Sequence, residues 1–87
     1  MLFLSIYSYP SEKRAQVIQR RLEKGAMDPP GSKLLGEWSY VGGGKVFRLI
    51  ETDDARNMLR SAGAWADLGQ IEVYPVLETE EALKLLR

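Results

Sequence analysis

Four short apolar segments in this sequence have the composition and spacing of β-strands. Residues 2–9 are rich in aromatic and aliphatic side chains, and Pro10 ends the run. Residues 33–40, 45–51 and 70–77 show a similar pattern between turn signals. We therefore predict four strands over these ranges.

The second and third of these strands are joined by Val41-Gly42-Gly43-Gly44. A glycine run favours a hairpin, because the turns that suit twisted strands need positive φ. The turn also sets the register of the two strands. The predicted cross-strand pairs are Tyr40 with Lys45, Trp38 with Phe47, and Glu37 with Arg48.

Residues 11–24 form the first predicted helix. Ser11 is placed to cap its N-terminus, and Gly25 ends it before a loop over residues 25–32. Apolar residues recur here at helical spacing, and we expect them to face the sheet. They are Ala15, Ile18 and Leu22.

A second helix is predicted after Thr52 or Asp53, either of which is a suitable N-cap, and its irregular end runs from Gly63 to Leu68. Thr79 caps a short third helix. The predicted apolar stripes are Ala55, Met58, Leu59 and Ala62 in the second helix, and Ala82, Leu83 and Leu86 in the third.

The predicted order is β-α-β-β-α-β followed by a terminal helix, which is the order of ferredoxin-like folds. The fold class is therefore α+β, with a four-stranded antiparallel sheet and a short C-terminal helix, in one domain over residues 1–87.

The alternation of side chains sorts this sheet into two faces. The first is almost wholly apolar and is expected to lie under the helices: Leu2, Leu4, Ile6, Leu34, Trp38, Phe47, Leu49, Ile71 and Val73. The second is mixed, but too apolar to face water alone: Phe3, Ser5, Tyr7, Leu35, Glu37, Ser39, Val46, Arg48, Ile50, Glu72, Tyr74 and Val76. We expect a homodimer that buries the second face by sheet-to-sheet contact.

Composition narrows the range of partners and chemistry. Twelve Lys and Arg residues balance twelve Asp and Glu residues, so we expect no nucleic-acid and no membrane partner. The chain has no cysteine and no histidine, which removes thiolate nucleophiles, the commonest metal ligand and the usual general base near neutral pH. No segment has the pattern of a signal peptide or a membrane span, so we expect a cytoplasmic protein. We predict no cofactor and no metal site.

Several segments together resemble a known family. They are Leu34-Leu35-Gly36-Glu37-Trp38, Phe47-Arg48-Leu49-Ile50-Glu51 followed by Asp53-Asp54, Trp65-Ala66-Asp67-Leu68, and Pro75-Val76-Leu77. Their order and spacing resemble the proteins grouped as domain of unknown function 3303, over nearly the whole chain. The resemblance implies the dimeric α/β-barrel superfamily, in which two ferredoxin-like protomers press their sheets together.

Relatives in that superfamily include antibiotic biosynthesis monooxygenase-like enzymes, isomerases, haem-handling enzymes and ligand-sensing domains. The resemblance therefore implies the fold more firmly than a function. It also implies a histidine directly after the position of Trp38, where this chain has Ser39.

Glu37 and Arg48, predicted to face one another across the hairpin, are the first candidate ligand-binding residues. A structural cross-strand ion pair is the simpler interpretation. In the functional interpretation, Arg48 anchors a carboxylate or enolate, because a guanidinium suits bidentate binding of oxygens.

Tyr7 and Tyr74 are the next candidates, since they share the second face with Ser5 and Glu72. Tyrosine hydroxyls beside a carboxylate would orient a small polar-aromatic ligand. The simpler interpretation places these tyrosines at a dimer contact, where they often bridge apolar and wet surroundings.

Trp38, Trp65 and Asp67 form the last candidate group. The two tryptophans would line a cleft between sheet and helices, with Asp67 as a general base whose pKa is raised by burial. In the simpler interpretation Trp38 is core, and Trp65 and Asp67 belong to a packed helix end.

Other features predict no site. Gly42-Gly43-Gly44-Lys45 lacks the spacing of a phosphate-binding loop and leads into a strand. The basic residues of the first helix alternate with acidic ones, and no carboxylate spacing matches a metal motif. We assign no catalytic residue.

Two functions remain. The first is a small homodimeric binding or accessory module for a small organic molecule. The alternative is a cofactor-independent monooxygenase-like or isomerase-like enzyme. Such an enzyme would hold its substrate with Arg48 or the tryptophan-lined cleft, and would use Tyr7, Glu37 or Asp67 for proton transfer.

Overall fold

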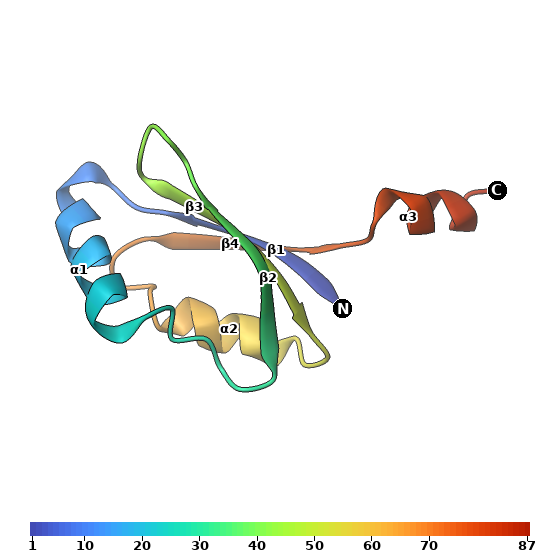
Figure 1. Ribbon diagram of the computed structural model, residues 1–87, viewed down its shortest axis with the longest axis horizontal. Coiled ribbons are helices and arrows are strands. Elements are labelled where there is room, and N and C mark those ends of the chain that lie inside the picture. Colours follow the sequence, from blue (N-terminus) through green and yellow to red (C-terminus); the bar gives the residue numbers. More distant parts are fainter.

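The computed structural model describes residues 1–87 and contains four strands, three α-helices and one short 3₁₀ helix (Figure 1). In chain order they are β1 (Leu2–Ser8), η1 (Ser11–Lys13), α1 (Arg14–Lys24), β2 (Ser32–Ser39), β3 (Lys45–Thr52), α2 (Arg56–Gly63), β4 (Gln70–Val76) and α3 (Thr79–Leu85).

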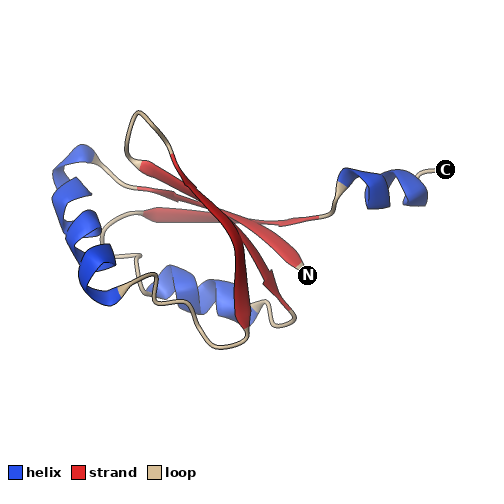
Figure 2. Ribbon diagram, viewed as in Figure 1, coloured by secondary structure: helices blue, strands red, loops and turns tan.

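The strands form one antiparallel sheet in the order β2-β3-β1-β4. Helices α1 and α2 cover one face of this sheet, and the other face is open (Figure 2). This confirms the predicted α+β, ferredoxin-like fold.

The β2–β3 hairpin forms in the predicted register. Trp38 pairs with Phe47 and Glu37 with Arg48, and the N–H of Tyr40 donates to the carbonyl of Lys45. Two glycines of the turn, Gly43 and Gly44, have φ near +85°. Residues other than glycine rarely adopt this backbone conformation.

The start of the first helical segment differs from the prediction. Ser11 does not cap it, because residues 11–13 form a 3₁₀ turn in which the N–H of Lys13 donates to the carbonyl of Pro10. Its end is as predicted: Gly25 has φ +69°, and its N–H donates to the carbonyl of Arg21.

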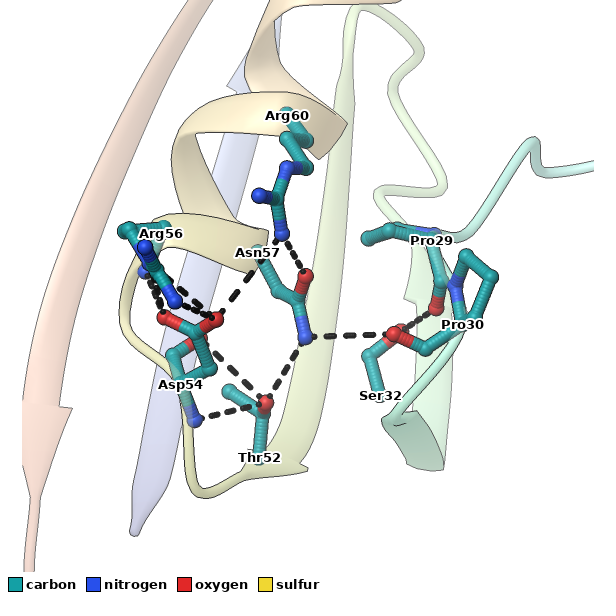
Figure 3. Close-up of polar contacts among 8 residues, drawn as sticks. All are labelled: Pro29, Pro30, Ser32, Thr52, Asp54, Arg56, Asn57 and Arg60. Carbon is teal, nitrogen blue, oxygen red and sulfur yellow. Dashed lines mark hydrogen bonds and ion pairs between the residues drawn. The ribbon is translucent and has the colours of Figure 1, made fainter.

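The N-terminus of α2 is held by Thr52 and Asp54 (Figure 3). The hydroxyl of Thr52 accepts from the N–H of Asp54 at 3.2 Å, and the Asp54 carboxylate accepts from the N–H of Arg56 at 3.0 Å. The predicted N-caps were wrong, because Thr52 is the last residue of β3, Asp53 is exposed, and the residue before the helix is Ala55.

The assignment of faces in the two central strands was wrong. In β1 the buried residues are Phe3, Ser5 and Tyr7, and those between them are only half-buried. Because β1 and β3 pair in register, Arg48 and Ile50 lie on this covered face. The open face carries Leu2, Leu4, Ile6, Phe47 and Leu49.

Of the two edge strands, β4 divides as predicted. Ile71 and Val73 lie on the covered face, where they pair with Tyr7 and Ser5. Glu72, Tyr74 and Val76 pair with Ile6, Leu4 and Leu2 on the open face. A bulge between Leu34 and Gly36 shifts the alternation in β2, which a strict period of two does not anticipate.

The helices bury little of their predicted stripes, and Met58 of α2 is the one stripe residue that is buried. In α1 only Val17 is buried, while Leu22 is 81% exposed. In α2 the buried residues are Asn57, Met58 and Ser61, and Leu59 is 77% exposed. Asn57 and Ser61 are polar, so α2 turns polar side chains toward the covered face, which itself contains the buried Ser5 and Arg48.

The buried apolar residues form two small clusters between the sheet and the helices. One contains Tyr7, Val17, Trp65 and Leu68, and the other contains Phe3, Ile50 and Met58. By contrast α3 projects away from the sheet at the end of β4 (Figure 1). No helix is long and apolar enough to cross a membrane.

The inverted faces make a direct prediction about stability. Phe3 is 5% exposed, so Phe3→Ala leaves a cavity and should lower the free energy of unfolding by about 3–5 kcal/mol. Leu22→Ala is the control, and it should change that free energy by less than about 0.5 kcal/mol. Urea unfolding measures both; equal effects of the two variants would contradict the assignment.

Candidate functional site

A cavity of about 70 Å³ lies between the covered face of the sheet and the two helices. Its wall is mostly apolar, with a few polar groups from the sheet and from α1. The lining residues are Ser5, Tyr7, Val17, Arg21, Ala26, Glu37, Val46, Arg48, Ser61, Trp65 and Ile71.

Arg48 is the most deeply buried charge in this wall, at 8% exposed. Its Nη2 donates to Oδ2 of Asp28 at 2.7 Å, and its Nε lies 2.9 Å from Oε2 of Glu37. The two carboxylates thus neutralise the guanidinium inside the fold, as a buried cation requires.

The Nε of Arg48 is fully buried against Glu37. It lies 2.9 Å from Oε2 of Glu37, close enough for an ion pair, although the N–H is not well aligned for a hydrogen bond to that oxygen. The partner of Nε is therefore the carboxylate of Glu37, and the pair is chiefly electrostatic.

Arg21 of α1 completes the charge cluster. Its Nη1 and Nη2 donate to the two oxygens of Glu37 at 2.9 and 2.8 Å. These hydrogen bonds, helped by the charge of Arg48, hold the pKa of Glu37 below its ordinary value of 4.5. The cluster contains two arginines and two carboxylates, so its net charge is zero.

Tyr7 and Trp65 form the aromatic end of the cavity. The Tyr7 hydroxyl donates to the carbonyl of Trp65 at 2.9 Å, and the two rings meet edge to face with centroids 5.9 Å apart. Burial raises the pKa of Tyr7 above 10.0. The indole Nε1 of Trp65 donates to the carbonyl of Ala26 at 3.2 Å, which ties this end to the loop after α1.

Asn57 holds the loop that carries Asp28 (Figure 3). Its Nδ2 donates to the hydroxyl of Thr52 at 3.1 Å and to the carbonyl of Pro30 at 3.3 Å. Because Asn57 is buried and comes from α2, it joins the loop to the sheet and the helix. It therefore fixes the position from which Asp28 reaches Arg48.

Asp67 does not line the cavity, and the prediction that burial raises its pKa was wrong. Asp67 is exposed, and both its oxygens accept from Arg20 at 2.7 Å. These hydrogen bonds lower the pKa of Asp67 instead. The same arginine lies over the ring of Trp65 at 5.5 Å, so Asp67 helps to fasten α1 to the end of α2.

Trp38 lies on the open face and not under the helices as predicted. Tyr74 lies on the open face with Glu72 as predicted, but Tyr7 and Ser5, which were predicted to share that face, lie on the covered one. Trp38 is 57% exposed and packs over Gly36, where a Cβ atom would come within 2.4 Å of its ring. The Tyr74 hydroxyl donates to Glu72, which raises the pKa of Tyr74. Neither residue touches the cavity.

Comparison with known proteins places this chain in a family. The model of the family described as "Domain of unknown function (DUF3303)" matches residues 1–87. The chain belongs to the DUF3303 family. This confirms the resemblance seen in the sequence.

A solved structure has the same fold. It is that of a Deinococcus radiodurans protein described as a candidate antibiotic biosynthesis monooxygenase, determined at 1.40 Å resolution. The likeness covers 88% of this chain and 92% of that one, with a TM-score of 0.51 and 15% sequence identity. At this identity the likeness shows the fold alone. No curated protein matches the sequence.

Of the residues predicted for this DUF3303 protein, four meet at the cavity: Tyr7, Glu37, Arg48 and Trp65. Sequence reasoning missed Arg21 and Asp28. Arg21 lies one helical turn after Val17, which would have indicated it had Val17 been recognised as the buried position. Asp28 was read only as part of a turn. No group of three or more acidic, histidine or cysteine residues in the structure could hold a metal ion.

The lowered pKa of Glu37 predicts a contribution to the pH dependence of stability. A carboxyl whose pKa is lower in the folded state stabilises the fold above its unfolded pKa, and that stability is lost as the pH falls through the folded pKa. The wild type should therefore lose more stability than Glu37→Gln between about pH 5 and pH 3.

Urea unfolding at both ends of this range measures the difference between the two proteins. Glu12→Gln, which changes an exposed carboxylate outside the cluster, is the control and should follow the wild type. Identical pH slopes for Glu37→Gln and the wild type would refute the pairing with Arg21.

Proposed function

We propose that this DUF3303 protein is a small homodimeric module that binds a small organic molecule between its sheet and its helices. The observation that carries the proposal is the cavity itself, whose mostly apolar wall includes the polar side chains of Ser5, Arg48 and Ser61. A ligand in the cavity would bury its apolar part against this wall and place an oxygen near these polar groups.

The charge balance of the cluster favours a neutral ligand. Asp28 and Glu37 already neutralise Arg48, and Arg21 balances the second carboxylate. An anionic ligand would add an uncompensated charge to a half-apolar wall, which is costly. A neutral carbonyl group adds no charge, so it suits this wall better than the carboxylate or enolate first considered.

The size of the cavity favours a small ligand. Its volume of about 70 Å³ is about half that of a cavity known to admit benzene, roughly 150 Å³. A molecule of about four non-hydrogen atoms fits without rearrangement. A larger ligand would require α1 to move outward, and α1 is held mainly by Val17 and by the pairs that Arg20 and Arg21 make.

The fold of the Deinococcus radiodurans protein favours a second candidate, a monooxygenase-like or isomerase-like enzyme. The groups at the cavity support binding over proton transfer. Glu37 has a lowered pKa and so is a weak base, and Tyr7 has a raised pKa and donates its proton to a carbonyl. A ligand retained from the host that is recovered unchanged would favour binding, whereas its conversion with uptake of dioxygen would favour the enzyme.

The open face of the sheet supports the homodimer. It presents a strip of apolar side chains from β1 and β3. An apolar strip of this kind is not normally left exposed to water. Along β3 its residues read Lys45, Phe47, Leu49 and Glu51. When a second copy of this strand runs antiparallel to the first, each lysine meets a glutamate of the other copy. The two strands are then complementary in charge.

Two isosteric probes test the ligand proposal. Acetone and acetate have the same shape and differ in charge. In NMR titrations acetone should shift the Arg48 Nε–H signal and saturate at an apparent dissociation constant at least about tenfold lower than that of acetate. Stronger binding of acetate, or no change at the Arg48 signal with either probe, would contradict the proposal.

A cavity-filling variant serves as the negative control for these titrations. Ala26→Leu fills space in the cavity wall without touching the charge cluster, and it should abolish the response to acetone. Ala15→Leu makes the same change on the exposed side of α1 and should leave it unaltered.

Exchanging the two charges tests the dimer. Lys45→Glu and Glu51→Lys should each raise the dimer dissociation constant about tenfold, since each creates two like-charge contacts at the edge of the interface. The double variant should return it to within about threefold of the wild type. Analytical ultracentrifugation measures all four proteins, and a wild type that stays monomeric at millimolar concentration would end the proposal.

A further inference from the structure

The segment 77–87, here called the C-terminal arm, is the least supported part of the molecule. It leaves the sheet at the end of β4 and carries α3 away from the body (Figure 1). Its leucines are exposed, and Leu86 reaches 81%. Of the arm, only Leu77 and Ala82 line a hollow beside Met1 and Leu2.

Helix α3 needs a stabilising contact that the rest of its own chain does not provide. A helix of seven residues is not stable alone in water, where about 12–15 residues are needed. It is amphipathic, with Ala82, Leu83 and Leu86 on one side and Glu80, Glu81 and Lys84 on the other. The pattern therefore indicates a helix that packs its leucine side against another surface.

The arm cannot cover the open face of its own sheet. A helix of seven residues is about 10 Å long, whereas four strands span about 19 Å. Tyr74 and Val76 of the open face lead directly into Leu77 of the arm. The open face and the arm thus form one continuous apolar surface that the same partner would cover.

The area of the open face indicates that a dimer needs the arm. Four strands of about seven residues have a footprint of only about 450 Å². A stable interface usually takes about 800 Å² from each partner. The four leucines of the arm, contributed by both copies, supply the apolar area that the sheet lacks.

We propose that the occupant is a second copy of this chain, and that each C-terminal arm lies on the body of the partner. This rests on the sheet-to-sheet dimer proposed above. Two copies would then exchange arms around their stacked sheets, and the contact with the partner would stabilise each α3.

Leucine variants in the full chain test this exchange. Leu83→Asp combined with Leu86→Asp should raise the dimer dissociation constant at least 100-fold. Leu59→Asp is the matched control, because Leu59 is equally exposed but lies on α2; it should change the constant less than threefold. The arm stands outside both buried clusters, so the body should stay folded in either variant.

A spin label shows where the arm lies. The chain has no cysteine, so Lys84→Cys places a single nitroxide on the polar side of α3. Chains that carry the nitroxide but no ¹⁵N are mixed with ¹⁵N-labelled wild-type chains. Broadening of the ¹⁵N-labelled amide signals then reports contact between different chains. Broadening of amides in the partner's body is the expected result.

The outcomes separate the two proposals. A dimer that tolerates the leucine variant and shows no broadening between chains would overturn arm exchange and leave the sheet-to-sheet dimer standing. A wild-type chain that stays monomeric would overturn both. Loss of the dimer in the leucine variant, together with broadening between chains, would support arm exchange.

Discussion

The covered side of this small sheet depends on the neutralisation of one buried cation. Arg48 belongs to a central strand of the sheet, and its side chain lies buried on the face that the helices cover. A guanidinium in this place is tolerated only because Asp28 and Glu37 reach it from a loop and an edge strand. The paths of the loop after α1 and of β2 are therefore linked to one side chain of β3.

The same electrostatics determine how α1 is attached. A helix usually packs on a sheet through an apolar stripe, but here α1 buries only Val17. Arg20 and Arg21 extend from the same helix to Asp67 and Glu37 in paired hydrogen bonds. Such contacts are directional and leave room beside them, which explains how a cavity persists in so small a core.

This arrangement also shows why some features could be predicted from the sequence and others could not. Element order, the hairpin register and the family followed from local signals such as the glycine turn and the spacing of apolar runs. The faces of the sheet did not, because Leu2, Leu4 and Ile6 are more apolar than Phe3, Ser5 and Tyr7, and hydrophobicity alone predicts the wrong side for the helices. Arg48 and Glu37 were found as a pair, but Asp28 and Arg21 reach them through tertiary contacts that no periodicity records.

The most direct test of the central claim is the free energy of unfolding of two variants of the charge cluster. Arg48→Met alone should cost about 3–5 kcal/mol, because it leaves Asp28 without its cation while Glu37 keeps only Arg21, so the cluster gains a net negative charge. Arg48→Met combined with Asp28→Asn should recover most of that loss, since Glu37 stays paired with Arg21 and no unpaired charge remains in the cluster. A cost below about 1 kcal/mol for Arg48→Met, with no recovery in the double variant, would contradict the account.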